Sequence, residues 1–128
     1  MKRFLLVFSL FLLTASFVSA QEKEAVLAVV GEAVHDFGTI KEADGPVSHI
    51  FKVKNEGNAP LIITKVTASC GCTQPEFPKE PIAPGKTGEI KVTYTPSGNA
   101  PFNKQISVYS NGKAGTTILS VKGVVEGK

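Results

Sequence analysis

The sequence predicts an all-β protein whose strands form an antiparallel sandwich of two sheets. Three observations support this fold class. Apolar and polar residues alternate over short segments, which is the period of a half-buried strand. These segments are bounded by glycine, proline, asparagine or aspartate, the residues that favour turns. From Ala25 onward no segment has the three-to-four-residue apolar spacing of a helix.

Residues 1–20 have the pattern of a secretory signal peptide. Lys2 and Arg3 form a basic start, an apolar run covers Phe4–Phe17, and Val18-Ser19-Ala20 places small residues where a signal peptidase cleaves. An uncleaved anchor is the alternative, but a membrane-spanning helix needs about 20 apolar residues, and this run is shorter. We therefore expect export to the periplasm or the medium, with no stable membrane insertion after cleavage.

The predicted mature chain, residues 21–128, is long enough for one domain with a hydrophobic core and too short for two. Removing Lys2 and Arg3 from the 14 basic residues leaves 12 against 11 acidic ones, so the mature chain is almost neutral. Arg3 is also the only arginine. Because bidentate recognition of phosphate and guanine normally uses arginine, nucleic acid is not expected as a partner.

Seven segments have the alternation of a strand, and they are, in order, Val26–Val30, Val34–Ile40, Val47–Lys54, Leu61–Ser69, Gly88–Thr95, Phe102–Ser110 and Thr116–Val125. Successive side chains of a strand point to opposite faces, so each segment should have one buried face. One wet face per strand favours two antiparallel sheets over parallel strands buried on both sides. The residues predicted to face inward include Val47, Phe51, Val53, Ile90, Val92, Tyr94, Phe102, Ile106, Val108, Leu119 and Val121.

The connections agree with this plan. Asn55-Glu56-Gly57-Asn58 and Ala83-Pro84-Gly85-Lys86 are turn sequences, and Ser110-Asn111-Gly112-Lys113 is typical of a hairpin between the last two strands. Four prolines between Thr73 and Pro84 predict a crossing segment between the sheets, because proline interrupts a hydrogen-bonded ladder. About 100 residues with seven strands and one long crossover are typical of an immunoglobulin-like sandwich.

Five motifs carry a family resemblance, namely Asp36-Phe37-Gly38, Asn55-Glu56-Gly57-Asn58-Ala59-Pro60-Leu61, Cys70-Gly71-Cys72-Thr73, Ile82-Ala83-Pro84-Gly85 and Tyr109-Ser110-Asn111. With these motifs nearly all of the mature chain resembles the exported bacterial family catalogued as domain of unknown function 1573. The asparagine-glycine and proline-glycine segments are shared more loosely with PapD-like and major-sperm-protein-like domains. The resemblance implies an immunoglobulin-like fold and export, and it implies no established activity.

Cys70 and Cys72 are the only cysteines, and three interpretations of them stay open. Cys70 shares a strand face with Ile62, Val66 and Ala68, where it would pack as a small buried thiol. Alternatively the two form a disulfide, since an exported chain meets an oxidising compartment. Two extended residues span about 6.6 Å, at the top of the roughly 4.4–6.8 Å that disulfides tolerate between Cα atoms. A bend at Gly71 would then be needed, which the missing Cβ of glycine permits.

A metal site is the third interpretation. Structural zinc takes four ligands, whereas soft Cu(I) could accept two thiolates. We predict no metal and no cofactor, but if a metal is bound, its ligands would be Cys70, Cys72 and His49. His49 is more typical of a packed or rim histidine, and His35 of a solvated one.

Sequence signatures of enzymes are missing. The chain has no G-x-S-x-G elbow, no H-E-x-x-H and no phosphate-binding glycine loop. A Cys–His nucleophile pair would also need an orienting group and an oxyanion site, and nothing in the sequence identifies them. We therefore expect the protein not to be an enzyme.

The first hypothesis for function is a non-enzymatic module of the cell envelope that binds another protein or a cell-surface polymer. Its expected surface is the loop Thr73–Lys86 with the Cys70 and Cys72 tip, where Phe77 would be an apolar anchor. Phe77 could equally fold back as a lid on the sandwich. The edge strand Val26–Val30 offers a second route, by strand addition. The alternative hypothesis is a thiol redox or Cu(I)-binding protein that uses the cysteine pair.

Overall fold

The computed structural model describes residues 23–127, which contain eight strands and one short 3₁₀ helix joined by loops. The signal peptide expected at residues 1–20 lies outside the described residues. No helix within residues 23–127 is long and apolar enough to cross a membrane. The elements are β1 (Leu27–Val30), β2 (Val34–Lys41), the 3₁₀ helix η1 (Glu42–Asp44), β3 (Val47–Asn55), β4 (Ile63–Ala68), β5 (Thr73–Glu76), β6 (Thr87–Tyr94), β7 (Pro101–Ser110) and β8 (Thr116–Glu126).

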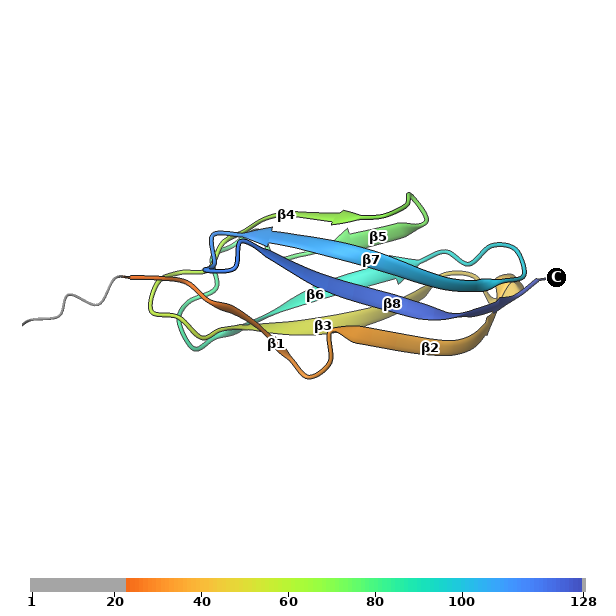
Figure 1. The fold of residues 1–128 in the computed structure, drawn as a ribbon, viewed down its shortest axis with the longest axis horizontal. Helices are drawn as coiled ribbons and strands as arrows, with labels where there is room; N and C mark the ends of the chain where they lie inside the picture. Colours follow the sequence, from red (N-terminus) through yellow and green to blue (C-terminus); the bar gives the residue numbers. More distant parts are fainter. Residues whose placement is uncertain (1–22, 128) are drawn as a thin grey trace, which may run out of the picture.

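The strands form two four-stranded sheets that pack face to face (Figure 1). We call them sheet A, with the order β1-β3-β6-β5, and sheet B, with the order β2-β8-β7-β4. The predicted antiparallel sandwich is confirmed, with the exception that β2 and β8 are parallel. This parallel pair arises because the chain crosses from sheet A to sheet B between β1 and β2 without reversing its direction (Figure 1).

The core between the sheets is made of the residues that the alternation predicted. Ten of the eleven residues predicted to face inward are buried, and Val47 is half-buried. Ala25, Leu61, Ile63, Ile82 and Val125 complete the core. The period of two in the sequence therefore gives the correct inward face in β3, β6, β7 and β8, because each of these strands is regular over its core positions.

Two details of the predicted strands are wrong. The sequence predicts a crossing segment that includes Thr73–Glu76, but these residues form an additional strand, β5, at the edge of sheet A. Proline is tolerated there because one side of an edge strand needs no hydrogen-bond donor. The fourth strand contains a bulge between Ile63 and Lys65. The extra residue shifts the alternation, so Ile63 is buried whereas Ile62 is 41% exposed.

The predicted turns are present, and one of them has a buried asparagine at its centre. Asn55, at the end of β3, is fully buried. Its Oδ1 accepts hydrogen bonds from the N–H groups of Val26 and Gly57, at 3.3 and 3.0 Å. Its Nδ2 donates to the carbonyl oxygens of Ala59 and Ile82, at 2.7 and 2.9 Å. One side chain therefore ties three chain segments to the end of β3.

Candidate functional site

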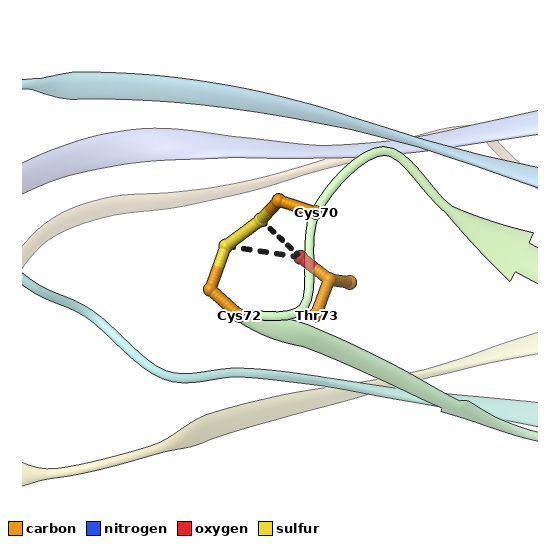
Figure 2. The surroundings of a disulfide bond; sticks show 3 residues. All are labelled: Cys70, Cys72 and Thr73. Atoms are coloured by element: carbon orange, nitrogen blue, oxygen red, sulfur yellow. Dashed lines mark hydrogen bonds between the residues drawn. A yellow bond between two sulfur atoms is a disulfide. The ribbon is translucent and has the colours of Figure 1, made fainter.

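The turn between β4 and β5 is closed by a disulfide between Cys70 and Cys72, with the two Cα atoms 5.3 Å apart (Figure 2). No free cysteine exists in the described chain. Of the three interpretations of the pair, the structure contains the second. The buried hydroxyl of Thr73 lies 3.9 Å from both sulfurs. A Cβ at Gly71 would meet no atom within 4 Å, so the bend does not depend on glycine at this position.

Main-chain hydrogen bonds fix this disulfide corner, which we define as residues 69–73, between the two sheets. The N–H of Ser69 donates to the carbonyl of Gln105 in β7, at 3.1 Å. The N–H of Thr95, just after β6, donates to the carbonyl of Cys72, at 2.8 Å. Cys70 and Cys72 are both half-buried, and Cys72 packs against the core. The corner is thus a turn fixed by main-chain hydrogen bonds, and its two cysteines are only half-buried.

The predicted binding loop Thr73–Lys86 is held along its length. Its first four residues are β5, and Ile82 is buried and pairs with Leu61 through two hydrogen bonds, of 2.8 and 2.9 Å. Phe77 follows β5 directly, is half-buried and packs partly against the core. The Nζ of Lys79 lies 3.5 Å from the centre of the Phe77 ring. Phe77 therefore covers part of the core, as a lid would, and still exposes part of its ring to solvent.

Phe77 also borders a shallow hollow of about 490 Å³ on the outer face of sheet A, which we call the outer hollow. Ile50, Pro78 and Phe77 supply its apolar surface, and Ile50 is 46% exposed. Its charged lining residues are Glu76, Glu89 and Lys91. The disulfide corner is at the other end of β5, about 13 Å away for a four-residue strand. The structure therefore does not gather Cys70, Cys72 and Phe77 into one site.

Two histidines are stacked between β2 and β3, at one side of the sandwich. The rings of His35 and His49 have centroids 3.7 Å apart and are inclined by 7°. Phe37 packs edge-on against His35 and Phe51 against His49, each at 4.6 Å. The pKa of His49 is lowered below its usual 6.5, mainly by burial and to a smaller extent by the charge of His35. The expectation of a solvated His35 is wrong, since this side chain is half-buried in the stack.

The sequence contained a signal for this pair that the pattern analysis did not use. The tripeptide His-x-Phe occurs at His35–Phe37 and again at His49–Phe51, so each strand carries a histidine and a phenylalanine on the same face. When two such strands face each other from the two sheets, their inward histidines can stack, as His35 and His49 do. The conditional metal set of Cys70, Cys72 and His49 is not assembled, because β6 separates β3 from β5. Within residues 23–127 no group of three potential ligand residues could hold a metal ion.

A groove of about 290 Å³ opens beside the histidine stack, and we call it the side groove. It lies where the chain leaves β1 and enters β2. Three of its apolar residues are unusually exposed, with Val30 at 50%, Val34 at 43% and Ile50 at 46%. The full lining is Val30, Glu32, Val34, His35, His49, Ile50, Phe51 and Lys52. Ile50 therefore borders both the side groove and the outer hollow.

Comparison with known proteins identifies relatives by sequence family and by fold. The family model described as "Protein of unknown function (DUF1573)" matches residues 28–125. No curated protein matches the sequence. Among solved structures, a protein of unknown function from Porphyromonas gingivalis W83 aligns with a TM-score of 0.69 at 20% identity, over 80% of this chain and 47% of that protein.

Two further structures share the fold. The ASH/PapD-like domain 7 of human CEP192 aligns with a TM-score of 0.66 at 8% identity, over 82% of this chain and 88% of the domain. The secreted serine protease VesC from Vibrio cholerae aligns with a TM-score of 0.58 at 14% identity, over 78% of this chain and 23% of the protease. The chain thus spans less than half of the Porphyromonas and Vibrio proteins. At these identities the likeness shows the fold alone, a PapD-like sandwich.

Proposed function

This chain belongs to the DUF1573 family of proteins of unknown function, and we propose that it is a non-enzymatic interaction module of the cell envelope. It binds another protein through the outer face of sheet A. The observation that carries this proposal is the outer hollow, where Ile50, Phe77 and Pro78 present apolar surface among charged residues. An apolar centre with a polar rim is the usual anatomy of a protein-binding patch.

The rigidity of the surface supports the same function. Ile50 and the charged residues Glu89 and Lys91 are on β3 and β6, the two central strands of sheet A. Phe77 is restrained by the core on one side and by Lys79 on the other. Because Ile50 is on a paired strand and Phe77 packs against the core, binding at this surface should lose less conformational entropy than binding at a free loop. A patch on paired strands is therefore a better docking surface than a free loop would be.

Action outside the cytoplasm is supported by two independent features. Residues 1–20 have the signal-peptide pattern, and Cys70 and Cys72 form a disulfide. Structural disulfides persist in the periplasm and outside the cell, whereas the cytosol keeps thiols reduced. The proposed partner is accordingly an envelope protein, and a cell-surface polymer is the alternative occupant that the experiment must separate.

The test compares two substitutions with equal exposure on opposite faces. Ile50 and Ile118 are both 46% exposed, Ile50 on sheet A and Ile118 on sheet B. The tagged mature protein is used to capture proteins from envelope extract, and its sedimentation with purified peptidoglycan is measured separately. We expect Ile50→Lys and Phe77→Ala to reduce protein capture at least about tenfold, as for residues of a binding hot spot, and Ile118→Lys to leave it unchanged.

Circular dichroism first establishes that each variant is folded. If folded Ile50→Lys and Phe77→Ala proteins capture the same partners as the wild type, the outer hollow is not the binding surface. If the wild type binds peptidoglycan and captures no protein, the partner is a polymer and the proposal of a protein partner is overturned.

A second candidate function is favoured by the disulfide corner. The bond joins two half-buried cysteines only two positions apart, which favours it as a substrate for thiol–disulfide exchange. A partner thiolate would attack one sulfur, form a mixed disulfide and release the other as a thiolate. A second partner thiol would then resolve the mixed disulfide, so the partner is oxidised by two electrons and Cys70 and Cys72 become thiols.

This candidate is tested by equilibrating the mature protein in glutathione buffers and trapping thiols with an alkylating reagent before mass measurement. A redox function predicts that the disulfide has a midpoint reduction potential of about −120 to −210 mV, the range of periplasmic and secretory-pathway oxidants. A midpoint below about −300 mV, typical of structural disulfides, would remove it. Copper binding needs free thiolates, so it is restricted to the reduced form.

A further inference from the structure

Strand β3 has a stretch of edge that no neighbouring strand covers. On one side β3 pairs with β6 from Val47 to Lys54. On the other side β1 pairs only with Lys52–Asn55, because β1 ends at Val30, opposite Lys52. Gly31, with a φ of 91°, then turns the chain away toward sheet B. Figure 1 shows this crossing, after which β2 continues in the other sheet. No strand of the described chain pairs with Ser48–Ile50 on this side.

The hydrogen bonds at the end of β3 show which main-chain groups face the open side. The N–H of Asn55 donates to Lys86, toward β6, whereas the N–H of Glu56 donates to Val26, toward β1. Main-chain groups alternate in direction along a strand, so even-numbered residues of β3 point toward the β1 side. The N–H and C=O groups of Ile50 and Ser48 therefore point to the position that β1 would occupy if it were longer.

Three of the four edge strands, β2, β4 and β5, are protected against strand pairing. Edge strand β2 has a register shift between Asp36 and Thr39, and edge strand β4 has one between Ile63 and Lys65. Edge strand β5 contains Pro75. Bulges and proline are the devices by which proteins block unwanted pairing at sheet edges. The Ser48–Ile50 stretch has none of them, because it belongs to a regular inner strand.

The side groove provides the space that an added strand needs. It lies beside Ile50 and is lined by Val30, Val34 and the stacked His35 and His49. In an antiparallel addition, residues opposite Ile50 and Ser48 would point outward beside Ile50, and the residue between them would point inward to the groove. The charged lining residues Glu32 and Lys52 have opposite signs. The groove therefore has no net charge to balance an ionised side chain, and an apolar inward residue fits it.

We propose that this open half-edge of β3 accepts a short extended segment of a partner protein, which runs in line with β1 and pairs antiparallel with Ser48–Ile50. The segment is rich in uncharged β-branched residues, because Ile50 and the groove offer apolar neighbours on both of its faces. Its main chain satisfies the unpaired groups of β3, which is the basis of recognition by strand addition. This inference deepens the proposed function, since Ile50 borders both the groove and the outer hollow, and it adds the kind of partner segment.

The test uses a synthetic peptide of alternating threonine and valine, with a lysine at each end for solubility. Its matched control is the same peptide N-methylated at every threonine and valine, which keeps the side chains and removes the main-chain donors. Amide exchange of the intact mature protein is followed by NMR. At a peptide concentration of about ten times its Kd, we expect the exchange of the Ser48 and Ile50 amides to slow about tenfold. The methylated peptide should leave both rates unchanged.

Each other outcome would overturn the inference. Unchanged exchange at Ser48 and Ile50 at saturating peptide would exclude pairing there, and equal protection by the methylated peptide would show that side chains rather than main-chain bonds cause it. Protection only at Thr116–Ile118 would place pairing on β8, where β2 also leaves an edge uncovered. Shifts confined to Phe77 and Lys91 would place the peptide in the outer hollow, which contradicts strand addition and leaves the proposed function standing.

Discussion

Asn55 is the clearest example of a single residue on which the local fold depends. All four of its amide hydrogen-bonding contacts are to main-chain groups, and its side chain is fully buried. The sequence predicted a turn at this position from the asparagine and glycine together. It did not show that the asparagine points inward, because asparagine and glycine are also common in exposed turns.

We predict that Asn55→Ala lowers the free energy of unfolding by about 2–4 kcal/mol, because the partly buried N–H groups of Val26 and Gly57 lose their acceptor and the buried carbonyl of Ile82 loses a donor. Asn111→Ala is the matched control. Asn111 also bridges two main-chain groups, those of Ile62 and Pro60, but it is exposed, so water replaces the lost contacts. Urea denaturation measures both, and a loss below about 1 kcal/mol for the first variant would contradict the assignment.

The histidine stack makes stability depend on pH. Because the pKa of His49 is lowered in the folded chain, the unfolded chain binds more protons below the usual value of 6.5. His49 therefore does not reduce the free energy of unfolding above pH 6.5, whereas below pH 6.5 the free energy of unfolding decreases as the pH falls. We expect the Tm to fall between about pH 7.5 and about pH 5.

His49→Phe should flatten this part of the pH profile, since Phe51 and His35 accept another aromatic ring in the stack. The Glu32 and Lys52 side chains that line the same groove stay in both proteins. A pH profile with the same slope in both proteins would assign the effect to other groups.

At the scale of elements, regular strands could be predicted and interrupted ones could not. Alternation gave the buried faces of β3, β6, β7 and β8, whose core positions repeat every second residue. It failed in β4, where the bulge changes the parity, and in β5, where Pro75 was taken to exclude a strand. In both places the fold depends on pairing with a distant strand, which a local pattern does not contain.

The paired strands β2 and β8 approach each other too closely at Gly123 to leave room for a side chain there. A Cβ on Gly123 would lie 2.7 Å from the main-chain oxygen of Gly38 and 2.9 Å from the Phe102 ring. We predict that Gly123→Ala lowers stability by about 1–3 kcal/mol, because a main-chain oxygen cannot move aside. Gly71→Ala is the control, with no atom within 4 Å of the new Cβ, and should stay within about 0.5 kcal/mol of the wild type. Thermal denaturation of both variants compares them.

The disulfide corner should contribute little to stability. A bond across two residues closes a very small loop, so the entropy removed from the unfolded chain is worth about 1–2 kcal/mol. We expect the Cys70→Ala, Cys72→Ala double variant to remain folded and to lose about this amount in urea titration. Complete unfolding of the variant would instead give the corner an essential structural role.

At the scale of the whole molecule, the candidate site was only partly predictable. Phe77, predicted as an apolar anchor or as a lid, packs against the core and also borders the outer hollow. The sequence assigned no role to Ile50, because alternation marks it only as an outward residue. The outer hollow joins residues from β3, β5 and β6, which are adjacent only after the sheet has formed. The cysteines and Phe77, close in sequence, are separated by the length of β5.

The same topology predicts slow folding. The ladders β2·β8 and β4·β7 join segments far apart along the chain, and sandwiches of this kind fold in milliseconds to seconds because loop closure precedes pairing. Stopped-flow refolding can be followed by tyrosine fluorescence, since Tyr94 is buried, Tyr109 is 38% exposed and the chain has no tryptophan. A refolding time of microseconds would contradict this expectation.

The parallel pairing of β2 with β8 gives the molecule a mechanical property. The two ends of the described chain leave the sandwich at opposite poles of its long axis (Figure 1). Tension at the N-terminal end loads β1 and, through it, β2, whereas tension at the C-terminal end loads β8. Because β2 and β8 are parallel, they are then pulled lengthwise in opposite directions and their hydrogen bonds are sheared together instead of being opened one after another. A domain with this topology is expected to resist stretching along its long axis.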